Sequence, residues 1–79
     1  MKENSFYNFY TYALPGGDRA RLVQEIFANG KLVDVEVWPG WLKRETCDQQ
    51  AVARNRMAIR EGNHISLYVM MYGEIAGAA

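Results

Sequence analysis

The residues best suited to nucleophilic or acid–base catalysis are scarce in this chain. It holds a single histidine, His64, and a single cysteine, Cys47. A serine triad needs a histidine positioned by an acid beside a nucleophile, and no nucleophile motif surrounds His64. Cys47 falls among small helical residues, where a buried thiol behaves as a small hydrophobic group. We therefore predict that the protein is not an enzyme.

Metal and phosphate chemistry also find little support in the sequence. One cysteine and one histidine do not complete a structural zinc site, and no carboxylate spacing matches a calcium-binding loop. Segment 15–19, PGGDR, is rich in glycine. It lacks the Lys-Ser/Thr pair of a phosphate-binding loop, so we interpret it as a turn. We expect no metal site and no cofactor.

One pair of carboxylates has a spacing that suits either catalysis or binding. Asp34 and Glu36 alternate with valines, so they project from one face of a predicted strand. Paired carboxylates perform acid–base chemistry when a cleft holds the substrate, and a thin sheet offers no such cleft. The alternatives are a solvated strand face or an acidic strip that meets a basic surface on a partner protein.

Basic residues gather in one predicted helix. Five of the nine Lys and Arg residues lie between positions 43 and 60. Arg56 and Arg60 are four residues apart on its outer side, where they can contact phosphates or a carboxylate-rich surface. The formal net charge is zero. A basic helix and an acidic strand therefore make the molecule dipolar, which favours oriented docking over bulk nucleic-acid binding.

Aromatic side chains are the remaining candidates for binding. They make up 13% of the chain, more than a thin core can hide, and Tyr and Trp dominate protein interfaces. Trp38 and Trp41 flank a Pro-Gly turn, where they either anchor a partner or seal the end of the core. The predicted partner-binding residues are Trp38, Trp41, Tyr68, Tyr72, Asp34, Glu36, Arg56 and Arg60.

The elements that position these residues follow from periodicity and from turn residues. Segments 5–14 and 31–38 have the composition and alternation of strands. Segment 42–61 is free of Gly and Pro and is followed by Gly62, which predicts a helix with a glycine cap. Its small residues Cys47, Ala51 and Ala58 allow it to lie close to a sheet. Segment 64–75 alternates and predicts a last strand.

Segment 18–29 fits two structures. As a helix it has Asp18 as N-cap and ends at Asn29-Gly30. As a strand it uses Asn29-Gly30 as a hairpin turn, with Ala28 opposite Lys31. We favour the hairpin, because segment 31–38 needs a neighbouring strand.

The predicted fold is therefore α+β: an antiparallel sheet of about four strands (β-β-β-α-β) with one helix packed on one face. Residues 1–79 are expected to form a single small domain. If segment 18–29 is helical, the order becomes β-α-β-α-β. The uncovered sheet face is predicted to show six residues and part of the first strand; the six are Tyr68, Met70, Tyr72, Phe27, Val23 and Trp38.

Composition indicates the compartment and the partners. A lone cysteine forms no internal disulfide, and the aromatic N-terminal residues do not resemble a signal peptide. The longest apolar stretch, 67–72, falls far short of the roughly 20 residues that span a bilayer. We expect a cytoplasmic protein with no membrane partner. A chain this short buries only a thin core, so a homodimer that adds buried surface is an alternative to a monomer.

In size, predicted architecture and lack of a catalytic constellation, the chain resembles small inhibitors of phages and mobile elements, the anti-CRISPR proteins among them. The resemblance implies a non-enzymatic inhibitor that binds a host nucleic-acid-processing complex, such as a CRISPR effector subunit. Asp34 and Glu36 would then occupy a positively charged nucleic-acid groove. The alternative, from another class, is single-stranded nucleic-acid binding through sheet aromatics backed by the basic helix; the equal numbers of acids and bases make nucleic acid the weaker prediction.

Overall fold

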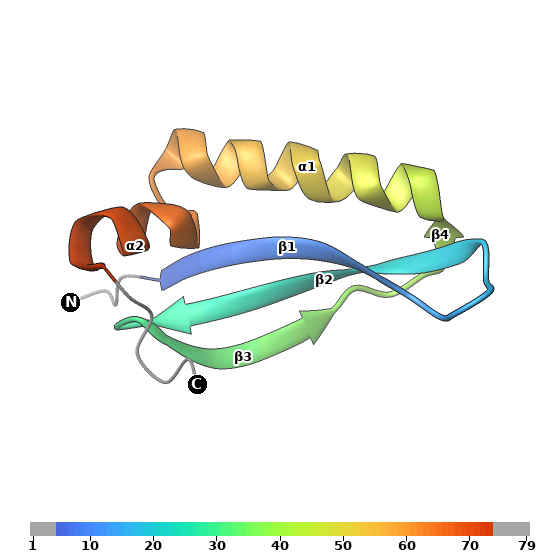
Figure 1. Cartoon of the computed structure of the whole chain (residues 1–79), viewed down its shortest axis with the longest axis horizontal. Coiled ribbons are helices and arrows are strands. Elements are labelled where there is room, and N and C mark those ends of the chain that lie inside the picture. The colour runs from blue at the N-terminus through green and yellow to red at the C-terminus, as the bar shows by residue number, and fades with distance from the viewer. Residues whose placement is uncertain (1–4, 74–79) are drawn as a thin grey trace.

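The computed structural model describes residues 5–73 and has an α+β fold (Figure 1). Three strands form an antiparallel sheet in the order β1-β2-β3, and a two-residue strand, β4, also pairs with β2. The predicted α+β class and the antiparallel sheet of four strands with a helix packed on it are confirmed; the predicted order β-β-β-α-β is wrong, because the fourth strand precedes α1 and a second helix follows it. The elements are β1 (Ser5–Ala13), β2 (Arg19–Ala28), β3 (Lys31–Val37), β4 (Leu42–Lys43), α1 (Arg44–Glu61) and α2 (Ile65–Tyr72).

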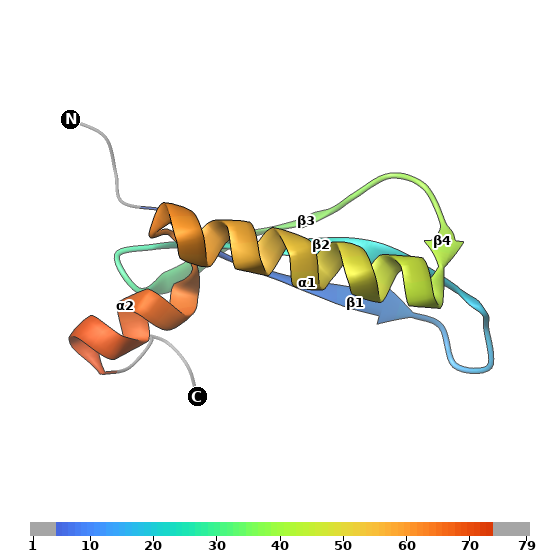
Figure 2. The same cartoon turned by 90° about the horizontal axis from the view of Figure 1, so that it is seen from above.

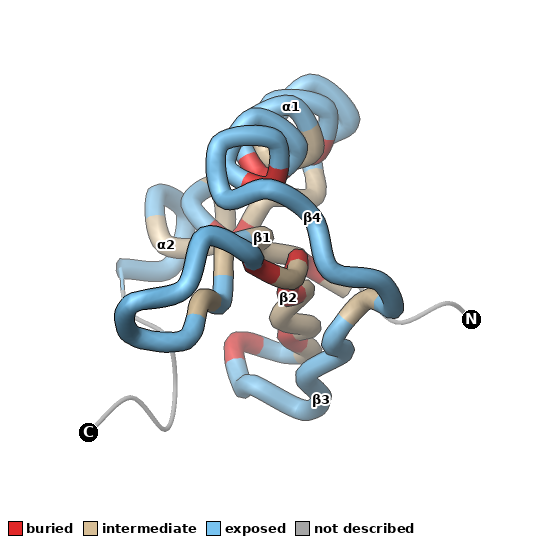
Figure 3. The backbone as a smooth tube through the Cα atoms, turned by 90° about the vertical axis from the view of Figure 1, so that its right-hand side faces the viewer, coloured by how far each residue is buried: buried red, intermediate tan, exposed pale blue. Residues whose placement is uncertain are grey.

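Helix α1 covers only part of the sheet. It runs along β1 and β2, while β3 lies furthest from it (Figures 1 and 3). Its small residues Cys47, Ala51 and Ala58 are buried, as predicted. Cys47 and Ala51 pack against Ala20 and Leu22 of β2 to form the core under α1. Because these side chains are short, the helix approaches the sheet closely and its long side chains remain at its flanks.

The predicted hairpin between β2 and β3 is confirmed, and the helical alternative for segment 18–29 is wrong. Asn29 and Gly30 join the strands with φ angles of 54° and 77°. A two-residue turn with positive φ at both positions matches the twist of antiparallel strands, and Asn-Gly favours it. Helix propensity in this segment is therefore overridden by strand pairing on both sides of β2.

A β-bulge shifts the register of β3 from the predicted one. Ile26 faces Asp34 and Glu25 faces Val35, whereas the hairpin turn alone predicts Ile26 opposite Val33 and Glu25 opposite Asp34. In the observed register Glu25 is no longer opposite Asp34, a like-charge pair that would be unfavourable.

The bulge also exchanges the faces of β3. Side chains alternate along a strand, so Asp34, Glu36 and Trp38 lie on the α1 side of the sheet. Val35 and Val37 lie on the opposite side. The prediction that Trp38 belongs to the uncovered face is therefore wrong.

Segment 64–75 is not a strand within the described residues: residues 65–72 form α2, and residues 74 and 75 lie outside the described range. Almost every residue of α2 is apolar, so helical and strand periodicity fit it equally well. Packing decides between them. Ile65 and Tyr68, one helical turn apart, lie against Phe6 and Phe27 of the sheet. Figure 2 shows α2 at the side of the molecule where β1 begins, far from the arrowhead of β1.

His64 caps the N-terminus of α2. Its Nδ1 accepts a hydrogen bond from the Ser66 N–H at 3.1 Å and lies 2.8 Å from the Ser66 Oγ. Burial lowers the pKa of His64 below its ordinary value of 6.5, because desolvation disfavours the charged ring. A protonated imidazole has no free lone pair at Nδ1 and cannot accept this bond.

This cap predicts a pH-dependent stability. Since the folded-state pKa lies below 6.5, the unfolded chain binds the proton more readily, and the free energy of unfolding should fall as the pH drops through 6.5 toward the folded-state pKa. Urea unfolding of the wild type and of His64→Asn, which caps without titrating, measures this effect. The stability difference between them should change with pH. Parallel pH profiles for the two proteins would contradict the prediction.

No helix in the described part of the chain, residues 5–73, has both the length and the apolar character required to cross a membrane.

Candidate functional site

The two edges of the sheet differ in how their main-chain groups are paired. At the β1 edge, the Tyr7 N–H donates to the Asn63 carbonyl at 2.8 Å. The Asn55 side chain brackets the next outward residue: its Oδ1 accepts from the Phe9 N–H at 2.8 Å, and its Nδ2 donates to the Phe9 carbonyl at 2.9 Å. Helix α1 and the 62–64 turn therefore cap the first half of this edge, at Tyr7 and Phe9.

The β3 edge is open among the described strands. All seven residues of β3 are exposed, and no described strand pairs with its outer side. The Trp38 N–H donates to the Leu22 carbonyl at 2.8 Å. Because inward and outward main-chain groups alternate along an antiparallel strand, Glu36 also pairs with β2. The N–H and C=O groups of Val35 and Val37 point outward.

The Asp34 side chain occupies one of the outward main-chain groups of this edge. Asp34 Oδ1 accepts a hydrogen bond from the outward Val35 N–H at 2.8 Å. The carboxylate thus satisfies an amide that would otherwise be free to pair with another strand, and charged residues commonly protect edges in this way. The Val37 side chain beside it is 49% exposed and that of Val35 is 44% exposed. The edge therefore combines an apolar side with an acidic one.

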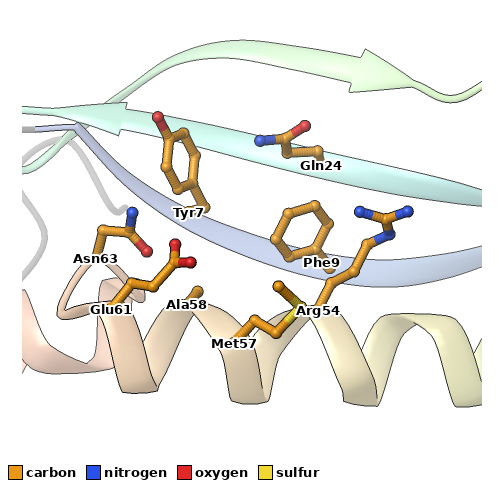
Figure 4. A pocket seen from close by; sticks show the side chains of 8 residues that line it. All are labelled: Tyr7, Phe9, Gln24, Arg54, Met57, Ala58, Glu61 and Asn63. Atoms are coloured by element: carbon orange, nitrogen blue, oxygen red, sulfur yellow. The ribbon is translucent and has the colours of Figure 1, made fainter.

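A groove of about 280 Å³ lies between α1 and the sheet on the α1 side (Figure 4). Its walls combine apolar side chains with two side-chain amides, Gln24 and Asn63. One basic and one acidic residue, Arg54 and Glu61, also line it. Glu36 pairs in register with the groove residue Gln24, so the acidic side of β3 borders this groove. The lining residues are Tyr7, Phe9, Gln24, Arg54, Met57, Ala58, Glu61 and Asn63.

Arg54 and Trp38 form one end of the groove region. The Arg54 guanidinium lies 4.2 Å from the centre of the Trp38 ring, and Figure 4 shows Arg54 reaching from α1 toward the sheet. The Trp38 Nε1 donates to Gln24 Oε1 at 3.3 Å, and Phe9 packs edge-on against the indole at 6.4 Å. Trp38 therefore closes the core beneath α1 and is held from three sides.

Two polar atoms of this region are buried without a hydrogen-bond partner among the described residues, the Nε of Arg54 and the Oδ1 of Asn63. In the sequence, Arg54 is recognisable only as one of the basic residues of segment 43–60, and no pattern marks Asn55 or Asn63. The stack of Arg54 on Trp38 joins residues far apart in the chain. Only the fold shows it, since no local pattern encodes the contact.

The other predicted tryptophan lies away from the groove. Trp41 is 46% exposed, and the Arg21 guanidinium is 5.4 Å from its ring centre. Arg21 Nε also donates to the Trp38 carbonyl at 3.0 Å. The turn thus directs one tryptophan into the molecule and leaves the other partly in solvent.

Tyr68 and Tyr72 lie on α2 and not on the uncovered sheet face. The Tyr68 ring packs edge-on against the Phe6 ring, with 5.4 Å between the ring centres. The centre of the Tyr72 ring lies 4.5 Å from that of Tyr68. Met70 also belongs to α2 and is 80% exposed. The prediction that these three residues belong to a sheet face is therefore wrong, because they lie in a helix.

Arg56 and Arg60 lie on the exposed outer side of α1, directed away from the sheet. Tyr10 and Tyr12, the exposed tyrosines of β1, alternate with Phe9 and so point to the side without α1. The basic pair and the sheet tyrosines therefore occupy opposite sides of the molecule. The eight predicted binding residues do not converge on one site; only Asp34 and Glu36 share a surface with the open edge.

No group of three or more His, Cys, Asp or Glu side chains within residues 5–73 is placed to hold a metal ion. No protein-family model, curated protein or solved structure matches the chain.

Proposed function

We propose that this protein is a non-enzymatic interaction module that binds another protein through β3. The observation that carries the proposal is the contrast between the two sheet edges. The β1 edge is capped at Tyr7 and Phe9 by Asn63 and Asn55, whereas β3 presents all seven residues to solvent. An exposed, partly apolar edge strand is a template for association with another chain.

Charge indicates the kind of partner. Asp34 and Glu36 both lie exposed on the α1 side of β3, and an acidic strip steers docking toward a basic surface. Proteins that process nucleic acids carry such surfaces where the phosphate backbone binds. Within this proposal the module is an inhibitor of the phage or mobile-element type, which occupies the basic groove of a host nucleic-acid-processing complex of the CRISPR kind.

Capture from a bacterial lysate, with and without nuclease and followed by mass spectrometry, tests this function. The tagged protein should retain a defined component of a nucleic-acid-processing complex after nuclease treatment. Replacing Asp34 by Asn together with Glu36 by Gln should lower its capture about tenfold or more, because the charges that face the basic surface are lost.

The matched control removes the same net charge at two exposed carboxylates outside β3 and the groove, by Asp18→Asn with Glu45→Gln, and should capture as well as the wild type. If the control loses capture and the β3 variant does not, β3 is not the contact. Disappearance of all captured protein on nuclease treatment would replace the proposal with nucleic-acid binding.

A further inference from the structure

We propose that β3 recognises its partner by strand addition: an extended basic segment, with Lys or Arg at alternate positions, pairs with the outer edge of β3. This inference rests on the proposed function and specifies its partner. Two sets of groups on β3 would bind the added strand. The main-chain groups of Val35 and Val37 point outward, and the carboxylates of Asp34 and Glu36 lie on one side of the same strand.

The register of an added strand follows from which groups point outward. Val35 and Val37 would exchange hydrogen bonds with the incoming main chain. Residues opposite Asp34 and Glu36 lie on the same face as these carboxylates, so two cationic side chains two positions apart complement them. Residues opposite the valines lie on the other face, where apolar side chains fit.

The same register argument disfavours a second copy of this chain. An antiparallel pair centred on Val35 places Asp34 opposite Glu36 of the other copy. A pair with Val35 opposite Val37 places the two Glu36 side chains opposite each other. A pair centred on Val37 brings Pro39, which lacks an N–H, opposite Val35. Like charges or a missing donor oppose each of these three registers, so a basic segment suits the Val35–Val37 stretch of this edge better.

Asp34 makes the recognition selective. Its Oδ1 holds the Val35 N–H in the free protein, and this bond must open before a strand can pair. A Lys or Arg opposite Asp34 provides a new partner for the carboxylate at the moment when the incoming carbonyl takes the amide. A neutral segment would leave the carboxylate without such a partner. The Asp34 side chain therefore disfavours pairing of β3 with a neutral strand and favours pairing with a basic one.

Synthetic peptides and calorimetry test this mode of binding. A peptide of alternating Val and Lys should bind the full chain at least about tenfold more tightly than one of alternating Val and Thr. A peptide of alternating Pro and Lys carries the same charge but lacks the N–H donors at the positions opposite Val35 and Val37; it should bind weakly. Equal binding of the two lysine peptides, or no binding of the Val-Lys peptide at 1 mM (roughly the weakest affinity worth measuring), would overturn strand addition.

Val35→Pro isolates the main-chain contribution. The Val35 N–H points away from β2, so proline there removes an outward donor and leaves the β2 ladder intact. We expect the affinity for the Val-Lys peptide to fall about tenfold or more. Val35→Ala shortens the side chain but keeps the N–H, so its loss of affinity should be clearly smaller than that of the proline variant. Equal losses in the two variants would overturn the strand-addition mode.

A second measurement does not depend on whether the proline variant folds. On addition of the Val-Lys peptide to the wild type, amide hydrogen exchange should slow at Val37 and at Val35. Unchanged exchange at both would overturn the proposal.

The lysate capture distinguishes failure of strand addition from failure of the proposed function. If the wild type and Val35→Pro capture the same lysate protein equally, strand addition is wrong and the proposed function stands. If the peptide binds as expected and the lysate yields no protein partner, the proposed function fails and the edge site remains.

Discussion

Replacing Asn55 by alanine is expected to lower the free energy of unfolding by about 2–4 kcal/mol. The Asn55 carboxamide fills the place of a neighbouring strand, because it pairs with both the N–H and the C=O of Phe9 at the β1 edge. Alanine leaves these two groups under α1 without a partner, and each unsatisfied group costs about 1–3 kcal/mol. Urea unfolding monitored by circular dichroism measures the change as a lower midpoint with an unchanged slope.

Gln49→Ala is the matched control for this variant. Gln49 lies exposed on the outer side of the same helix, so its loss should change stability by less than about 0.5 kcal/mol. If Asn55→Ala is no more destabilising than Gln49→Ala, the Asn55 bracket does not hold α1 to the sheet, and the closed β1 edge needs another explanation.

Replacing Gly30 by alanine is expected to cost about 2–4 kcal/mol. Gly30 has a φ of 77°, where an L side chain is strained. A Cβ there would also overlap the phenol ring of Tyr68, and this ring is confined by Phe6 and Tyr72. Overpacking of a confined ring costs about 1–3 kcal/mol beyond the backbone strain. The shift of the thermal or urea midpoint measures the sum.

Gly40→Ala separates the cost of backbone strain from the cost of the overlap with Tyr68. Gly40 also has a positive φ, 94°, but an added Cβ would meet nothing within 4 Å, so only strain of about 1 kcal/mol should appear. In a Tyr68→Ala background, the cost of Gly30→Ala should fall to the level of Gly40→Ala, since the overlap is gone. An undiminished cost in that background would show that α2 does not rest on the β2–β3 turn.

Local signals in the sequence are sufficient to predict most of the fold. Asn29-Gly30 indicates the hairpin, and Gly62 indicates the end of α1; its N–H donates to the carbonyls of Ala58 and Ile59, with a φ of 83°. These features depend on neighbouring residues alone. The small residues Cys47 and Ala51 likewise identify the buried side of α1 from its periodicity.

What the sequence analysis misses depends on contacts between distant residues. Segment 65–72 is apolar apart from Ser66, and its helix depends on the His64 cap and on the packing of Ile65 against Phe6. The bulge in β3 carries one readable signal: the hairpin register would place Glu25 opposite Asp34, an unfavourable pair that the bulge avoids. A predicted like-charge pair is thus a reason to consider a shifted register.

The candidate site follows the same division. The alternation of Asp34 and Glu36 with valines predicts an exposed acidic strip, and both residues lie exposed on β3. Their relation to the open edge depends on the bulge and on the hydrogen bond from the Val35 N–H to Asp34. The position of Trp38 under Arg54 depends on the packing of α1. Residue types indicate which groups bind, and the fold decides which of them act together.

The outer edge of β3 as the recognition element is tested most directly by amide hydrogen exchange, measured by NMR on the complex with the protein retained after nuclease treatment. We predict that exchange at Val35 and Val37 slows at least about tenfold on binding, because both amides join a ladder with the partner strand. Unchanged exchange at these two amides, with new protection in α1 around Arg56 or along the groove at Arg54, would contradict the account.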